Sequence, residues 1–198
     1  MIRLFGTLCL SLLWTAAIAA QQGGTNATAQ SVDHAAQPSP EHRELGALAG
    51  RWNLEVTYNA GNGKTMTATG TAENRMVLGG RFLISESTSS VPAGAPAGMT
   101  AIDSMRIYGF DRRTRTFTIV ELDSLGTYWV TAAGTKKDAN TIVMSGETLD
   151  DHGGAPEMRQ YDMVLRVIDR DTYAAEVIFK FANRPPVTLV EMLHRRIK

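Results

Sequence analysis

The sequence has little cysteine, no excess of charge of either sign, and no long hydrophobic run after its first twenty residues. Of its 198 residues one is cysteine, and 20 lysines and arginines balance 20 aspartates and glutamates. The even charge and the lack of Lys/Arg runs exclude the basic surface that phosphate backbones require, so we expect no nucleic-acid partner. The lack of a second apolar run excludes a multi-span membrane protein. The 43% of hydrophobic residues is typical of a globular chain with room for one domain.

Residues 1–20 are predicted to be a secretory signal peptide. The segment carries a positive charge at Arg3, an apolar run over 8–14, and small residues at its end. The apolar run is shorter than the roughly 20 residues that a membrane-spanning helix needs. Removal of the segment also removes Cys9, the single cysteine. We therefore expect an exported protein, periplasmic or secreted, with no disulfide and no integral membrane segment.

Residues 21–40 are predicted to be a disordered tether, and residues 41–198 are predicted to be the folded domain. The tether consists mainly of Gln, Gly, Thr, Ala, Ser and Pro, and has almost no large apolar side chain to offset its ordering entropy. A short helix is expected over 41–48, with Ser39 as its cap and Gly50 as its stop.

The rest of the chain alternates apolar and polar residues with the period of two that indicates half-buried strands. About ten strands are predicted, over 52–58, 65–77, 81–88, 101–110, 116–123, 127–135, 141–148, 159–168, 172–181 and 187–197. The turns between them are short, so neighbouring strands are expected to pair antiparallel. Closing such a meander removes its two edges. We predict an all-β, up-and-down antiparallel barrel that encloses a cavity, and a two-sheet sandwich is the alternative.

Several short motifs recur at the starts and ends of these strands. They are LAGRW at 48–52, LGGRFL at 78–83, YGFD at 108–111, DS at 123–124 with GT at 126–127, and EMLHRR at 191–196. As a set they resemble a large bacterial family of exported proteins of unknown function with lipocalin-like (calycin-like) barrels, and the resemblance covers residues 42–196. It implies a barrel and export but no agreed activity, since fold does not imply function. Related ten-stranded barrels bind fatty acids or haem. His194 stands where the family pattern has Tyr.

Polar side chains embedded in otherwise apolar strands are the candidate ligand-binding residues. A carboxylate on a core face is costly unless it is paired or lines a wet cavity, and tyrosine rings are well suited to pocket walls. The candidates are Glu86, Arg106, Tyr108, Glu121, Asp123, Tyr128, Arg159 and Tyr161. Two interpretations stay open: a set that orients a ligand, or a network of salt bridges and solvated strand ends.

Binding of a small apolar or amphipathic molecule is the function that this pattern favours, and three alternatives remain. An enzyme would use cavity carboxylates such as Glu121, with one pKa raised in an open cleft. A haem-binding barrel would use His194 as axial ligand, whereas a strand-end histidine facing solvent is the plainer interpretation. A structural or protein-interaction module would expose an apolar patch at the loop 91–98 and a sheet edge. The histidines lack the spacing of metal ligands, so no metal or cofactor is predicted, and the oligomeric state is not indicated.

Overall fold

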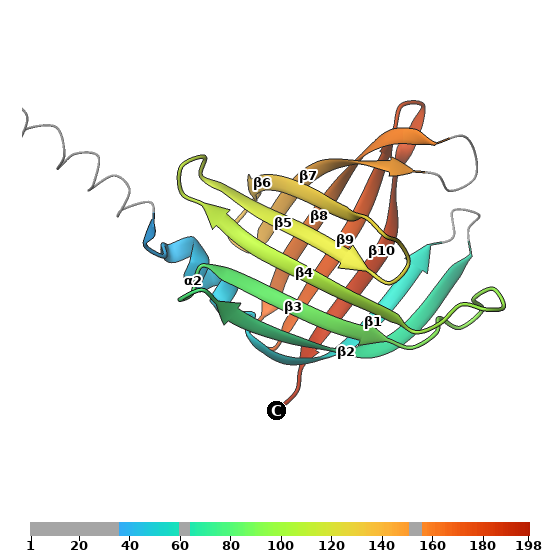
Figure 1. The fold of residues 1–198 in the computed structure, drawn as a ribbon, viewed down its shortest axis with the longest axis horizontal. Helices are drawn as coiled ribbons and strands as arrows, with labels where there is room; N and C mark the ends of the chain where they lie inside the picture. The colour runs from blue at the N-terminus through green and yellow to red at the C-terminus, as the bar shows by residue number, and fades with distance from the viewer. Residues whose placement is uncertain (1–35, 60–63, 151–155) are drawn as a thin grey trace, which may run out of the picture. The chain divides into compact units, whose positions relative to one another are not determined.

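Within the residues that it describes, the computed structural model has ten strands preceded by a short helix (Figure 1). The structure describes residues 36–59, 64–150 and 156–198. The predicted signal peptide at 1–20 and most of the predicted tether at 21–40 lie outside these residues. The chain divides into the units Met1–Gln37 and Pro38–Lys198, and every element below belongs to the second.

The strands follow one another without a crossover. They are β1 (Gly50–Asn59), β2 (Thr65–Val77), β3 (Phe82–Ser89), β4 (Ile102–Asp111), β5 (Thr116–Asp123), β6 (Trp129–Lys136), β7 (Thr141–Asp150), β8 (Glu157–Asp169), β9 (Thr172–Phe181) and β10 (Arg184–Arg196), after the helix α2 (Pro40–Gly46). Each strand pairs antiparallel with its neighbours in sequence, and β1 pairs with β10, for example Trp52 with Arg196. The prediction of a closed ten-stranded barrel is confirmed, and the sandwich alternative is wrong.

The predicted strand ends differ from the observed ones by at most three residues, and the largest difference is at β10. The last strand is predicted to start at residue 187, but β10 already begins at Arg184 and includes both prolines. Its register with β9 shifts between Arg184 and Val187. Proline is tolerated at such an irregular strand start because the missing N–H costs no regular ladder bond there.

The helix α2 is shorter than expected and ends at Gly46 rather than Gly50. The carbonyl of Leu48 accepts hydrogen bonds from the Trp52 indole at 3.0 Å and from the Asn74 amide at 2.9 Å. This carbonyl is therefore bonded to side chains of β1 and β2 and not to a further helical turn. Gly50 instead begins β1 with a φ of +129°, a backbone conformation that favours glycine. Within the described residues, no helix is long and apolar enough to cross a membrane.

One end of the barrel is filled by large side chains beneath α2. Leu45 and Leu48 are buried there together with Trp52, whose ring packs edge-on against Tyr173 with centroids 4.7 Å apart. The guanidinium of Arg196 lies 4.1 Å from the Trp52 ring centroid. Because this half of the interior is packed, the open space of the barrel lies in the other half.

Candidate ligand-binding site

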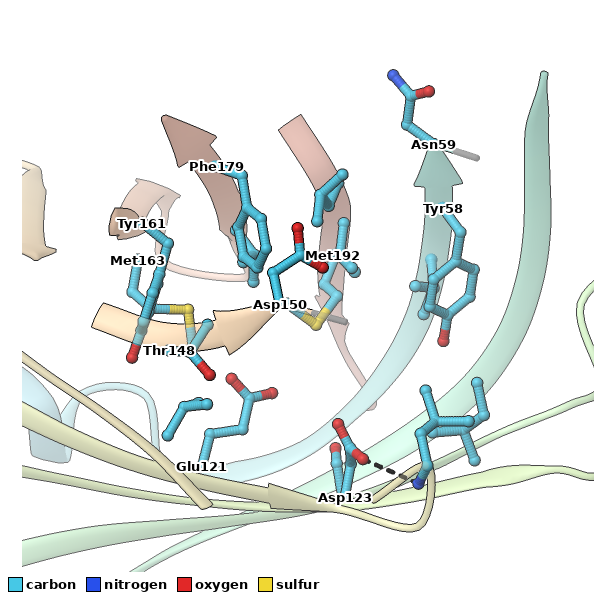
Figure 2. A pocket seen from close by; sticks show the side chains of 18 of the residues that line it. Tyr58, Asn59, Glu121, Asp123, Thr148, Asp150, Tyr161, Met163, Phe179 and Met192 are labelled. Atoms are coloured by element: carbon cyan, nitrogen blue, oxygen red, sulfur yellow. Dashed lines mark hydrogen bonds between the residues drawn. The ribbon is translucent and has the colours of Figure 1, made fainter. Parts of the chain in front are cut away.

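The half of the barrel away from α2 contains a cavity of about 730 Å³, to which all ten strands contribute lining residues. Its walls are mainly aliphatic and aromatic, with Val177 and Phe179 on β9, Met163 on β8 and Met192 on β10. Figure 2 shows Met163, Phe179 and Met192 around this space. The volume falls within the range of about 300–1,000 Å³ that small-molecule sites occupy.

The inward face of β3 changes from a large to small side chains along the strand, and this leaves room for the cavity. On its inward face this strand carries Leu83 at the filled end and then Ser85, Ser87 and Ser89. The Ser87 hydroxyl lies 2.8 Å from that of Ser104 on β4, and both residues line the cavity. The small side chains at these three alternate positions leave space in the middle of the barrel.

A buried ion pair lies in the wall of the cavity. Arg106 on β4 and Glu121 on β5 face each other across the two strands, and the Arg106 guanidinium donates to the Glu121 carboxylate. Burial lowers the pKa of Arg106, but the charge of Glu121, its hydrogen bond and the nearby Tyr108 and Tyr173 together outweigh burial and raise the pKa above its ordinary value, so this arginine stays charged. Glu121 points into the cavity in Figure 2. The pair itself has no net charge, although it places two opposite charges beside an apolar space.

A second ion pair lines the cavity farther from the helix. The Arg159 guanidinium donates to the Asp150 carboxylate at 2.7 Å, and both side chains are largely buried. Arg159 also lies 4.3 Å from the ring centroid of Phe181, and Arg184 lies 3.5 Å from the same centroid. With Asp123, three arginines and three carboxylates line the cavity among the described residues. The formal charge of this described part of the lining is therefore zero.

A cluster of buried polar side chains lies at the filled end. The His194 ring stacks on Tyr173 with centroids 4.0 Å apart, and the Tyr173 hydroxyl accepts a hydrogen bond from the Asn74 amide at 2.9 Å. Burial lowers the pKa of His194 to about 3, with a further contribution from the charge of Arg106. Among the described residues, Asn74 Oδ1, Arg106 Nε and His194 Nδ1 are buried without a hydrogen-bond partner. His194 is thus a neutral residue of the core.

The position of His194 corrects both expectations for this residue. Its side chain is only 1% exposed, so it does not face solvent at a strand end. It is also absent from the described lining of the cavity, which includes Met192 two residues earlier, and its Nδ1 atom is buried. An axial haem ligand needs a ring nitrogen open to the haem. This arrangement does not present one, and no group of three metal-ligating side chains occurs among the described residues.

The structure brings most of the predicted site residues together. Those that line the cavity are Arg106, Glu121, Asp123, Tyr128, Arg159 and Tyr161. Tyr108 is buried on β4, and burial raises its pKa to about 12. Glu86 lies elsewhere, half exposed and 3.6 Å from the Arg75 guanidinium. The expectation that Glu86 lies on a core face is wrong, because the alternate residues of β3, from Leu83 onward, face inward.

The cavity carboxylates do not provide the feature on which the enzyme alternative depends. Glu121 is paired with Arg106, and Glu86 is outside the cavity beside Arg75. Asp123 is exposed and accepts a hydrogen bond from the backbone N–H of Leu125 at 2.9 Å, the dashed line in Figure 2. None of these three carboxylates is held unpaired in a buried cleft, where a general acid or base is expected.

Sequence reasoning missed several lining residues on β9 and β10. Phe179 and Phe181 were assigned to a strand but not to the site, and Arg184 was assigned to a turn. The alternation of Val177, Phe179 and Phe181 is the signal that indicates one shared inward face on β9.

Comparisons with known proteins agree with this fold. A family model described as a protein of unknown function (DUF1579) matches residues 37–196. The chain is similar to the crystal structure of Rv2717c from M. tuberculosis, with a TM-score of 0.56 and 13% identity over 82% of this chain and 100% of that chain. It matches a redesigned β-barrel with a TM-score of 0.37 and 12% identity, over 79% of this chain and 96% of that one. No curated protein matches the sequence. At 13% identity the likeness to Rv2717c shows the barrel fold alone.

Proposed function

The chain belongs to the DUF1579 family of proteins of unknown function, and from the cavity we propose that it binds a small, neutral, amphipathic molecule inside the barrel. The observation that carries the proposal is the 730 Å³ space with apolar walls and two internal ion pairs. A protein interior is normally close-packed, so a space of this size in the middle of a barrel is typical of a binding site.

The apolar walls supply the binding free energy. Aliphatic and aromatic side chains such as Val130, Val177 and Phe179 surround the space, and burial of apolar surface contributes about 25 cal/mol per Å². Met163 and Met192 add flexible side chains that adapt to the shape of a ligand. A molecule with a substantial apolar part is therefore favoured over a sugar or a nucleotide.

The ion pairs determine the charge of the ligand. Arg106 and Arg159 each have a carboxylate partner in the cavity wall, Glu121 and Asp150 respectively. A ligand with an ionised carboxylate would leave one negative charge uncompensated in a buried space, which is costly. A hydroxyl or amide head group instead accepts from the arginines and donates to the carboxylates, and an ester accepts from the arginines, without changing the net charge.

We also propose that the protein acts outside the cytoplasm, as a carrier or sensor in the periplasm or the external medium. The support is the sequence of residues 1–20, with Arg3, a short apolar run and small residues at the end. The mass of the protein isolated from its own host tests this proposal. A chain that has lost about its first 20 residues is expected, and an intact chain beginning at Met1 would contradict export.

A fluorescence titration tests the binding function. N-phenyl-1-naphthylamine, a neutral probe that brightens in apolar surroundings, is expected to bind and to be displaced by hexadecan-1-ol. Palmitate, with a chain of the same length and a carboxylate, is expected to displace it at least about tenfold less well, which corresponds to 1.4 kcal/mol. If neither the probe nor the alcohol binds, the proposed function is wrong. If palmitate displaces the probe better than the alcohol does, the assignment of a neutral ligand is wrong.

A further inference from the structure

The strands β6 and β7 are hydrogen-bonded to each other over only part of their length. Within the described residues their pairing runs from Lys136 and Ile142 to Ala132 and Gly146, and no pair follows. Beyond this point β6 extends back to Trp129 and stays paired with β5, while β7 continues as far as Asp150 and stays paired with β8. Figure 1 shows the two strands side by side near the start of β7 and separating toward its end. The barrel wall is therefore split on the side away from α2.

The side chain of Tyr161 occupies the place where the pairing ends. Its hydroxyl donates to the backbone carbonyl of Thr131 on β6 at 2.8 Å, a carbonyl next to the last paired residue. Its ring packs against Gly146 on β7, where an added Cβ would lie 2.9 Å from Tyr161 Cζ. Tyr161 thus donates to the carbonyl at the end of the β6–β7 ladder and fills the space beside Gly146, so its side chain marks the place where the two strands begin to separate.

The cavity reaches the split itself. On β7, the consecutive residues Thr148, Leu149 and Asp150 all line the cavity, and Val130 lines it on β6. Successive side chains of a strand point to opposite faces, so an intact wall exposes only alternate residues to the interior. Leu149 is 55% exposed and still lines the cavity at a position where β7 has no partner on β6, which indicates that the edge of β7 borders the cavity.

Exposed apolar side chains flank the split on the outside. Trp129 at the start of β6 is 68% exposed and pairs across the sheet with Leu122. Leu149 near the end of β7 pairs with Met158 on β8, and both are more than half exposed. Single exposed apolar residues are common, but a group of them beside the opening of an apolar cavity marks a site of interaction with an apolar molecule.

We propose that the split between β6 and β7 is the portal through which the apolar chain of the ligand enters the cavity. The proposal rests on the proposed function and adds a route and a ligand class, a neutral amphiphile with one flexible chain. Trp129, Leu149 and Met158 contact the chain first, and Val130 and Tyr161 guide it inside. The strands need not lose any ladder bond, because none joins them at the portal in the described part of the barrel.

A crosslink across the split tests the portal. Thr131→Cys and Glu147→Cys place thiols on the exposed faces of β6 and β7 just beyond the last pair, in a full-length chain whose only natural cysteine is replaced by Cys9→Ala. A short bismaleimide joins the two thiols, and mass spectrometry verifies the crosslink. The matched control is Thr118→Cys with Ala133→Cys, at a pair of β5 and β6 that is already hydrogen-bonded. Association and dissociation of N-phenyl-1-naphthylamine are then measured by stopped-flow fluorescence.

Closing the portal is expected to slow association and dissociation by the same factor, about tenfold or more, and to leave the dissociation constant unchanged. The crosslinked control is expected to keep the rates of the unmodified protein. Equal rates for the two crosslinked proteins would overturn the portal while leaving the proposed function intact. Failure of the uncrosslinked protein to bind the probe would overturn the proposed function and the portal together.

Discussion

The pair of Arg106 and Glu121 is the most consequential contact at the scale of single residues. Both side chains are buried, and each provides the other's counter-charge in the wall of an apolar cavity. Removing one partner of such a pair leaves an uncompensated buried charge, whereas replacing both with apolar residues does not. Loss of one partner is therefore expected to destabilise the fold more than replacement of both partners by apolar residues.

The variant Glu121→Gln is expected to lower the free energy of unfolding by about 3–5 kcal/mol, because Arg106 keeps its charge without a partner. The double variant Arg106→Met with Glu121→Leu is expected to stay within about 1–2 kcal/mol of the natural protein. Urea denaturation measures both. A single variant as stable as the natural protein would show that the pair is not buried in solution.

His194 is expected to make the protein less stable in acid. Its pKa in the folded state is about 3, below the ordinary 6.5, so the unfolded chain binds the proton first as the pH falls. The stability is fully present above pH 6.5 and declines between pH 6.5 and 3, by up to about 1.4 kcal/mol per pH unit. Unfolding measured between pH 7 and 4, in comparison with His194→Gln, gives the contribution of this residue. Parallel pH profiles for the two proteins would contradict a buried neutral histidine.

At the scale of elements, the sequence predicts the strands well and their faces less well. The period of two locates β2, β5 and β9 with their observed ends. On β3 both faces carry apolar residues at the start, Phe82 with Ile84 on one and Leu83 on the other. The pattern alone does not indicate which face turns inward, because the serines that follow Leu83 are typical of an exposed face yet line the interior. For this reason Glu86 was placed in the site.

The split between β6 and β7 has an expected signature in backbone hydrogen exchange. Amides of residues 129–131 and 148–150 that point toward the split have no paired residue across it in the described structure, so peptides covering them are expected to exchange faster. Residues 161–166 of β8, which pair on both sides, provide the protected reference. Exchange measured by mass spectrometry checks this expectation. Equal protection of the three segments would show that the two strands are joined along their whole length.

At the scale of the whole molecule, the closed barrel follows from the sequence but the position of the cavity does not. A run of ten strands with short turns predicts closure, which the structure confirms. Which half of the interior is filled depends on contacts between residues far apart in the sequence, for example Trp52 against Tyr173. Such contacts depend on the packing of the complete barrel, so no local sequence pattern indicates them.

Filling the cavity is expected to remove binding without unfolding the barrel. Val177→Trp adds a large ring to the wall of the cavity, and Ile178→Trp adds the same ring to the next residue of β9, on the opposite face. The first variant is expected to lose binding of N-phenyl-1-naphthylamine by about tenfold or more, and the second to retain it. The thermal unfolding midpoint, measured on both, controls for a general loss of structure.

The central claim is that the cavity holds a small molecule, and native mass spectrometry of the protein purified from its own host tests it most directly. The natural protein and Ile178→Trp are expected to carry the same bound mass, which organic extraction releases as a neutral amphiphile. Val177→Trp is expected to carry none. A folded natural protein that carries no bound molecule, or a bound mass that persists in Val177→Trp, would contradict the claim.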